Sequence, residues 1–362
     1  MNKLKLGTFG TNLDGGFTAT KAEERHRLDW PTTVRVAQLT EKAGFEIQVP
    51  LARWKGLGGD TNFCGTNYEP LTWAAGVGAV TQKSKIFSTV HVPVIHPIVA
   101  AKQMITADHI SGGRFGLNVV CGWSPPEFAM FGKPMMDHDS RYAYAGEWIE
   151  AVKLLWTSEE PVDFEGKYIR IEKGEANPKP LSRPHPPIMQ AGQSETGARF
   201  AAKYADIAFK DVGEGEPIED VRRRFDDLRR LGREEFNREF EIWTACWVIC
   251  KPTQHEAERY RDYVLEEMGD LAILDAMPPN LVPKGDSPEA RFARQKVLGG
   301  FGGVHLVGSP DRIVDRLTEI SSAGADGVVL SFVNFEDGVG DWMKHVAPLL
   351  EQAGLRSAAA GA

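Results

Sequence analysis

The stretch SGGRFGLNVVCGWSPPEFAMFG, residues 111–132, reads as a buried strand that runs directly into a loop rich in proline and aromatic residues. Alternation along RFGLNVV places Asn118 on the face opposite Phe115, Leu117 and Val119. A buried amide costs free energy unless it is hydrogen-bonded. We therefore expect the Asn118 side chain either to bond a neighbouring backbone group or to face a ligand.

Strand-like segments alternate with helical patterns on both sides of this stretch. We expect eight strands, each followed by a helix, at residues 4–10, 45–50, 85–94, 114–121, 186–192, 206–211, 241–250 and 326–335. Such alternation is typical of α/β proteins with a parallel sheet. Eight units favour a closed (β/α)8 TIM barrel, which typically needs about 250 residues. The alternative is an open doubly wound sheet, but its G-x-G-x-x-G fingerprint is missing from the sequence, as are the phosphate loop and the G-x-S-x-G elbow.

Two segments interrupt the alternation. Residues 158–186 are expected to hold a small hairpin and the proline-rich NPKPLSRPHPP, and residues 270–305 are polar and rich in glycine and proline. Loops of this length usually act as lids or binding loops. We predict a single barrel domain over residues 1–355, with these insertions forming a lid, and a flexible tail over residues 356–362.

The composition narrows the class of protein. With 42% apolar and 25% charged residues, the chain has the composition of a soluble globular protein. Its net charge of −8 argues against nucleic acid as a partner. No apolar run approaches the ~20 residues that span a bilayer, no signal-like region opens the sequence, and the four scattered cysteines read as free thiols. We expect a cytoplasmic protein that binds neither nucleic acid nor membrane.

In a barrel, the chemistry lies at the carboxyl ends of the strands. Ser194 follows such an end and begins a helix, where its hydroxyl and the free N–H groups could bind a phosphate or form a plain N-cap. Arg141 and Tyr142 open another helix and suit a phosphate, or they form a solvated helix start. Thr89, on the strand before Asn118, faces the same choice between packing and ligand binding.

Other residues near the strand ends are less specific. His91 and His96 lack a carboxylate-bearing motif and are separated by proline, so no metal site is expected. Trp54, Trp123 and Phe131 belong either to the core or to the walls of a pocket for a flat aromatic ligand.

Three longer runs resemble a known family. ITADHISGGRFGLNVVCGW, RYAYAGEWIEAVKLLW and KPLSRPHPPIMQAGQS are similar to the bacterial luciferase-like flavin monooxygenases, closest to the pyrimidine monooxygenase and dimethylsulfone monooxygenase branch. The resemblance covers nearly the whole chain. It implies a barrel that receives reduced FMN from a separate NAD(P)H:flavin reductase and reacts it with O2. A flavin peroxide, favoured at N5, would then oxygenate and cleave a C–N, C–S or C–halogen bond of a small substrate. The resemblance also implies a homodimer or homotetramer.

The same resemblance assigns roles to individual positions. It implies that the FMN-binding residues are Ala52, Arg53, Asn118, Glu127, Arg141, Tyr142, Gly192 and Ser194. It implies that Thr89 and Asn118 flank the oxygen site and are the catalytic pair. Where the sequence departs from the pyrimidine enzymes, we expect the substrate wall to differ. The substrate-side candidates are Trp54, His91, Cys121 and Trp123.

Other functions remain open at this point. A deazaflavin (F420)-dependent dehydrogenase of the same superfamily would have this barrel but would transfer hydride without consuming oxygen. A non-catalytic barrel would bind flavin and turn nothing over. A metal-dependent hydrolase needs carboxylate and histidine clusters that the sequence does not suggest.

Overall fold

The computed structural model describes residues 2–213, 215–277, 282–283, 285 and 287–357. The chain divides into two compact units. The first unit comprises Met1–Tyr68, Asp211–Asp226 and Ile242–Ala362, and the second comprises Glu69–Lys210 and Asp227–Glu241. The described residues contain no helix of the length and hydropathy needed to cross a membrane.

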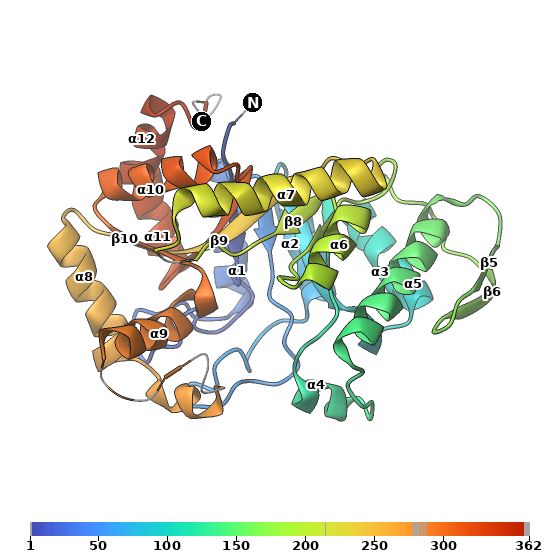
Figure 1. The fold of residues 1–362 in the computed structure, drawn as a ribbon, viewed down its shortest axis with the longest axis horizontal. Coiled ribbons are helices and arrows are strands. Elements are labelled where there is room, and N and C mark those ends of the chain that lie inside the picture. The colour runs from blue at the N-terminus through green and yellow to red at the C-terminus, as the bar shows by residue number, and fades with distance from the viewer. Residues whose placement is uncertain (1, 214, 278–281, 284, 286, 358–362) are drawn as a thin grey trace. The chain divides into compact units, whose positions relative to one another are not determined.

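The strands of the first unit run in parallel in the order β10-β9-β11-β1-β2. Their bounds are β1 Lys5–Phe9, β2 Ile47–Val49, β9 Glu241–Cys250, β10 Val304–Gly308 and β11 Gly327–Phe332. The helices that accompany them (Figure 1) are α1 Trp30–Lys42, α8 Gln254–Asp262, η2 Tyr263–Glu267, η3 Leu271–Ala276, α9 Pro288–Leu298, η4 Gly300–Gly302, α10 Pro310–Ser322, α11 Phe335–Asp341, η5 Trp342–Val346 and α12 Ala347–Gln352. Helix α7, Ile218–Phe236, contributes to both units.

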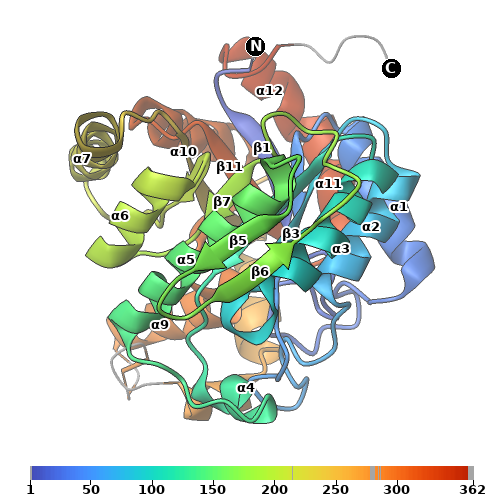
Figure 2. The same ribbon diagram turned by 90° about the vertical axis from the view of Figure 1, so that its right-hand side faces the viewer.

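The second unit carries four parallel strands in the order β3-β4-β7-β8. They span β3 Lys85–His91, β4 Phe115–Val120, β7 Ile188–Gln190 and β8 Ile207–Phe209. Its helices are α2 Pro70–Val80, η1 Val92–Val94, α3 Pro97–Ile110, α4 Pro125–Met130, α5 His138–Thr157 and α6 Glu195–Tyr204. The antiparallel hairpin β5 Val162–Glu165 and β6 Arg170–Gly174 lies beside α5 (Figure 2), so the predicted hairpin in residues 158–186 is confirmed.

The predicted fold class is confirmed. The sheet reads β10-β9-β11-β1-β2-β3-β4-β7-β8, and a further pairing of β9 with β8 closes it into a parallel barrel with flanking helices. All eight predicted strands are present, and β10 is an additional strand that the sequence analysis missed. It lies at the end of the segment 270–305, where glycine-rich GGFGG obscured the alternation of VHLVG.

The predicted insertion 270–305 contains more regular structure than expected. Helix α9 occupies its centre and begins at an ordinary helix-start signal, because Ser287 accepts a hydrogen bond from Ala290 N and Pro288 follows as the first helical residue. Residues 278–281, 284 and 286 lie outside the described residues. The role of this segment as a lid stays a prediction.

The predicted tail begins with two anchored residues. Arg356 donates to Leu4 O at 3.0 Å and to Gly44 O at 2.7 Å, and Ser357 N donates to Asn2 Oδ1 at 2.9 Å. Residues 358–362 of the predicted tail lie outside the described residues.

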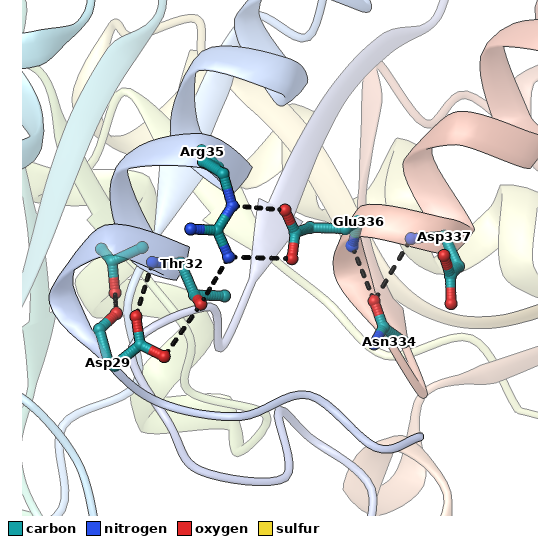
Figure 3. Close-up of polar contacts among 7 residues, drawn as sticks. Asp29, Thr32, Arg35, Asn334, Glu336 and Asp337 are labelled. Carbon is teal, nitrogen blue, oxygen red and sulfur yellow. Dashed lines mark hydrogen bonds and ion pairs between the residues drawn. The ribbon is translucent and has the colours of Figure 1, made fainter.

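Within the first unit, the starts of α1 and α11 are joined by a polar cluster (Figure 3). Asp29 caps α1 by accepting from Thr32 N at 2.7 Å, and Asn334 caps α11 by accepting from Glu336 N at 2.9 Å. Between the two caps, Arg35 Nε donates to Glu336 Oε1 at 2.8 Å. Both caps satisfy N–H groups that a helix start leaves without intrahelical partners, so this cluster fixes where the two helices begin.

The turn before β4 accounts for the residues Gly-Gly-Arg at the start of the stretch 111–132. Gly112 and Gly113 adopt φ of 67° and 82°, a backbone conformation that glycine reaches without steric cost. Arg114 then reaches back to the end of α2. Its guanidinium donates to Gly78 O, Thr81 O and Ser84 O at 2.8 Å each, and to Thr81 Oγ1 at 3.0 Å. One side chain therefore satisfies carbonyl groups that the helix end leaves open.

A second anchor, in the first unit, holds the loop that follows β2. Asp270, which is fully buried, accepts hydrogen bonds from Asp60 N at 3.0 Å, Thr61 N at 2.7 Å and Thr61 Oγ1 at 2.6 Å. Burial by itself would raise the pKa of Asp270, but the hydrogen bonds from Thr61 and Asp60 outweigh it and lower the pKa below its ordinary value.

We predict that Arg114→Met lowers the free energy of unfolding by about 3 kcal/mol, because it leaves several half-buried carbonyl groups without a donor. Urea denaturation measures the change. Arg170→Met, on the exposed hairpin, is the control and should leave the free energy of unfolding within about 0.5 kcal/mol of the parent. Equal stability of the two variants would contradict the role given to Arg114.

We predict that Asp270→Asn destabilises the protein by about 1–2 kcal/mol at pH 7. Because the pKa of Asp270 is lowered on folding, its contribution is fully present above the unfolded value, about 3.9, and is lost as pH falls through the folded-state pKa. The stability difference between parent and variant should therefore shrink below pH ~4. Urea midpoints across pH measure this difference, and the exposed control Asp275→Asn should leave the free energy of unfolding at pH 7 within about 0.5 kcal/mol of the parent. A difference that stays constant down to acid pH would refute the linkage.

Candidate active site

Thr89 and Asn118 form a buried pair on adjacent strands. They are register partners in β3 and β4, and their side chains are only 6% and 5% exposed. Asn118 Nδ2 donates to Thr89 Oγ1 at 3.0 Å. Within the described residues, Asn118 Oδ1 has no hydrogen-bond partner. The amide is thus satisfied at its nitrogen by a side chain, while its oxygen remains available to a ligand donor.

His91 extends the same strand face toward the carboxyl end. It lies two residues beyond Thr89 on β3, so its side chain points to the same side of the sheet, and it is buried. The loop after β4 passes close to His91. A Cβ atom added at Gly122 of this loop would lie 3.9 Å from His91 Cδ2. Three predicted residues are therefore brought together on one face: Thr89, His91 and Asn118.

A polar cluster joins the starts of α5 and α6. Ser194 is the N-cap of α6, and its Oγ accepts from Gly197 N at 3.0 Å. His138 Nε2 lies 3.1 Å from the same Oγ. The phenol of Tyr142 lies beside Ser194 and Gln190, and both act to lower its pKa. The predicted residues Tyr142 and Ser194 are therefore in contact, on two different helices.

A side chain at Gly192 would force its neighbours to shift. A Cβ there would lie 2.2 Å from Tyr142 Oη and 2.5 Å from Gln190 Nε2, closer than van der Waals contact allows. Because Gly192 has no side chain, the chain that follows β7 can come close to the Tyr142 phenol. Burial raises the pKa of Tyr142, and the nearby Cys121 adds to this, so the phenol stays protonated at neutral pH and can donate a hydrogen bond.

Arg141 is a buried cation. It is 9% exposed, its Nη1 donates to Met136 O at 2.9 Å, and its Nε has no partner in the part of the chain that the structure describes. No described carboxylate pairs with it. Isolated buried charges are costly, so such a guanidinium suits an anionic ligand.

Cys121 lies within reach of the Arg141 charge. Burial raises the pKa of the Cys121 thiol to about 12, and Arg141 only partly opposes this. At neutral pH the residue is a protonated thiol and therefore a poor nucleophile. It can form part of a wall, but it is not suited to covalent catalysis.

The remaining predicted residues occupy other positions. Ala52 and Arg53 are buried and Trp54 is 38% exposed, and all three lie in the loop after β2 in the first unit. In the second unit, Glu127 of α4 is buried, whereas Trp123 is 54% exposed.

Sequence reasoning missed two members of the polar cluster, Gln190 and His138. Gln190 is 2% exposed, and its Oε1 has no partner among the described residues. His138 stands four residues before Tyr142, and the two rings lie 5.1 Å apart. The helix predicted to open at Arg141 begins at His138, which puts His138 and Tyr142 four residues apart on one helix. The signal available for Gln190 was its position as the polar residue that closes the apolar run PPIM.

No group of three or more histidine, cysteine, aspartate or glutamate side chains among the described residues is arranged to hold a metal ion. The site instead offers amide, hydroxyl, phenol and guanidinium groups. These are ligands for an organic cofactor with an anionic end, not for a transition metal.

Comparison with known proteins agrees with this geometry. The family model described as luciferase-like monooxygenase matches residues 6–327. The chain is 29% identical over 358 residues to the FMNH(2)-dependent dimethylsulfone monooxygenase of Pseudomonas putida, covering 96% of each chain. It is 30% identical over 360 residues to the pyrimidine monooxygenase RutA of Caulobacter vibrioides, covering 96% of this chain and 99% of that one.

A solved structure, that of long-chain alkane monooxygenase (LadA), matches the fold with a TM-score of 0.86 at 21% identity, covering 100% of this chain and 94% of that one. The region that the family model matches includes β3, β4 and β7, the strands that carry the site in the second unit. The resemblance inferred from the sequence is confirmed: the chain belongs to the luciferase-like monooxygenase family.

Proposed function

We propose that this protein is a two-component FMN-dependent monooxygenase. It uses reduced FMN from a separate NAD(P)H:flavin reductase, together with O2, to oxygenate and cleave a C–N, C–S or C–halogen bond of a small organic substrate. The observation that carries the proposal is the buried Asn118 amide, whose oxygen has no partner among the described residues. Relatives named as FMNH(2)-dependent dimethylsulfone monooxygenase and pyrimidine monooxygenase support it. We also propose a cytoplasmic homodimer or homotetramer.

The residues of the second unit fit a reduced flavin ring. Reduced flavin presents N–H donors at its edge, and Asn118 Oδ1 is a buried acceptor that needs one. The bond from Asn118 Nδ2 to Thr89 Oγ1 holds the side-chain amide on the face that it shares with Thr89 and leaves Oδ1 for a ligand donor. Reduced FMN, when bound, would supply the electrons that activate O2.

The cluster at the starts of α5 and α6 fits the phosphate of FMN. Arg141 supplies a buried positive charge, Tyr142 a phenol donor and Ser194 a hydroxyl at a helix start. Glu195 in the first turn of α6 is exposed, so solvent screens its charge. FMN carries a single phosphate, and this set does not need the G-x-G-x-x-G loop of dinucleotide sites.

Around the reacting centre, the chain's contribution is to exclude water. Thr89, His91 and Asn118 are all less than a tenth exposed. Desolvation protects a reactive oxygenating species from hydrolysis. We propose His91, Cys121, Trp123 and Trp54 as the substrate wall, and the family resemblance assigns Ala52, Arg53 and Glu127 to FMN.

The phosphate assignment is tested by comparing FMN with riboflavin. We predict that the parent binds reduced FMN more tightly than reduced riboflavin, and that Arg141→Gln and Ser194→Ala each reduce this preference by about 10-fold or more. Anaerobic fluorescence titration measures both affinities. Thr253→Ala removes another N-cap, that of α8, and should leave the preference unchanged. A preference that survives both site variants would contradict the assignment.

The ring assignment is tested at Asn118. We predict that Asn118→Ala lowers the rate of FMN-dependent oxygenation by about a hundredfold, because a preorganised polar group at the reacting centre is lost. The measurement is product mass with labelled O2 in a screen of small C–N, C–S and C–halogen compounds. Ser88→Ala, on the opposite face of β3, is the matched control. Oxygenation at the parent rate in Asn118→Ala would remove the amide from the mechanism.

Oxygen uptake in the same assay separates the rival functions. A deazaflavin-dependent dehydrogenase would reduce its substrate without consuming O2, and a non-catalytic barrel would bind reduced FMN without forming product.

A further inference from the structure

A second cavity lies in the same unit as the candidate active site but at the other end of the strands. Its volume is about 550 Å³. Its lining includes Lys85, the first residue of β3, and Pro187 and Asp206, which directly precede β7 and β8. It therefore opens at the amino ends of the parallel strands, whereas Asn118 and Ser194 belong to their carboxyl ends. We call it the basic cavity.

The lining of the basic cavity is strongly positive in a chain of net charge −8. It contains five lysine or arginine side chains and one carboxylate, that of Asp206. Two of the five cations are neutralised within the protein. Arg238 pairs with Asp206 at 2.8 Å, and Lys203 pairs with Glu150 at 3.2 Å.

The other three cations have no carboxylate partner among the described residues: Lys85, Lys153 and Arg183. The half-buried Lys153 Nζ donates to Tyr204 O at a long 3.4 Å, and Arg183 donates to Pro180 O. Burial lowers the pKa of Lys153 and the neighbouring Arg238 charge lowers it further, while the charges of Asp206 and Glu150 only partly oppose this. The cavity therefore concentrates positive potential, and clefts lined by one sign of charge attract ligands of the opposite sign.

A role in stabilising the fold explains only some of the five cations that line the basic cavity. Arg238 Nη1 also donates to Lys203 O at the end of α6, where a cation suits the helix dipole. Lys85 and Arg183, by contrast, are exposed and pair with no carboxylate that the structure describes. The volume also falls in the range of small-molecule sites, about 300–1,000 Å³.

We propose that the basic cavity is a second ligand site, which binds a small phosphorylated anion with more than one negative charge. Arg183 offers a planar fork that matches phosphate oxygens, while Lys85 and Lys153 offer point charges. The site is independent of the proposed flavin chemistry, because none of its residues belongs to the flavin or oxygen set.

The test is calorimetric titration of the full chain with pyrophosphate at low ionic strength. The double variant Lys85→Gln/Arg183→Gln should bind pyrophosphate at least tenfold more weakly than the parent. The matched control Lys167→Gln/Arg170→Gln removes the same charge from the exposed hairpin and should stay within twofold of the parent. Arg141→Gln should also retain binding, which separates this cavity from the FMN phosphate site.

A second measurement needs no variant. Pyrophosphate should protect Lys85 and Lys153 of the parent from acylation by an amine-reactive reagent, with Lys167 as the unprotected internal standard, as read by mass spectrometry. Absence of pyrophosphate binding, loss of binding in Arg141→Gln alone, or equal binding by the double variant would overturn the proposal. Citrate binding as tight as pyrophosphate binding would overturn the assignment to phosphate compounds.

Discussion

The arrangement of the candidate active site depends on one hydrogen bond between neighbouring strands. Asn118 gives its nitrogen to Thr89 and keeps its oxygen without a partner among the described residues. A core amide would normally be satisfied at both ends, because each lost hydrogen bond costs about 1–3 kcal/mol. A ligand that donates a hydrogen bond to Asn118 Oδ1 would satisfy this amide, which explains why a polar side chain is kept on a buried strand.

The rest of the second unit is consistent with this constraint. Arg114 ties the start of β4 to the end of α2, so the strand that carries Asn118 is fixed at its amino end. Beyond its carboxyl end, helices α5 and α6 meet through Tyr142 and Ser194. Helices and strands therefore supply both the amide and the groups proposed to bind the phosphate, so the geometry of both is set by the fold.

Much of this could be read from the sequence, for physical reasons that differ between elements. The alternation around Asn118 separated it from the face of Phe115, Leu117 and Val119. The helix start predicted at Ser194 is confirmed. Strand β10 was missed because glycine breaks the pattern before it. Gln190 and His138 were missed because their importance arises from contacts between elements far apart in the chain, which no local pattern records.

The two ends of the parallel strands in the second unit carry different chemistry. At the carboxyl end, amide, hydroxyl and phenol groups accompany the buried Arg141 guanidinium, as suits a large cofactor with an anionic group. At the amino end, several cations gather without enough carboxylates to balance them. The amino ends of barrel strands usually serve stability, and a surplus of positive charge works against that role because like charges repel.

The burial of the Cys121 thiol affects how well this residue resists oxidation. Enzymes that handle O2 release some hydrogen peroxide whenever turnover fails, and peroxide attacks the thiolate form of cysteine. With its pKa near 12, Cys121 holds almost no thiolate at cellular pH. At the proposed substrate wall, such a thiol would resist oxidation better than an exposed thiolate.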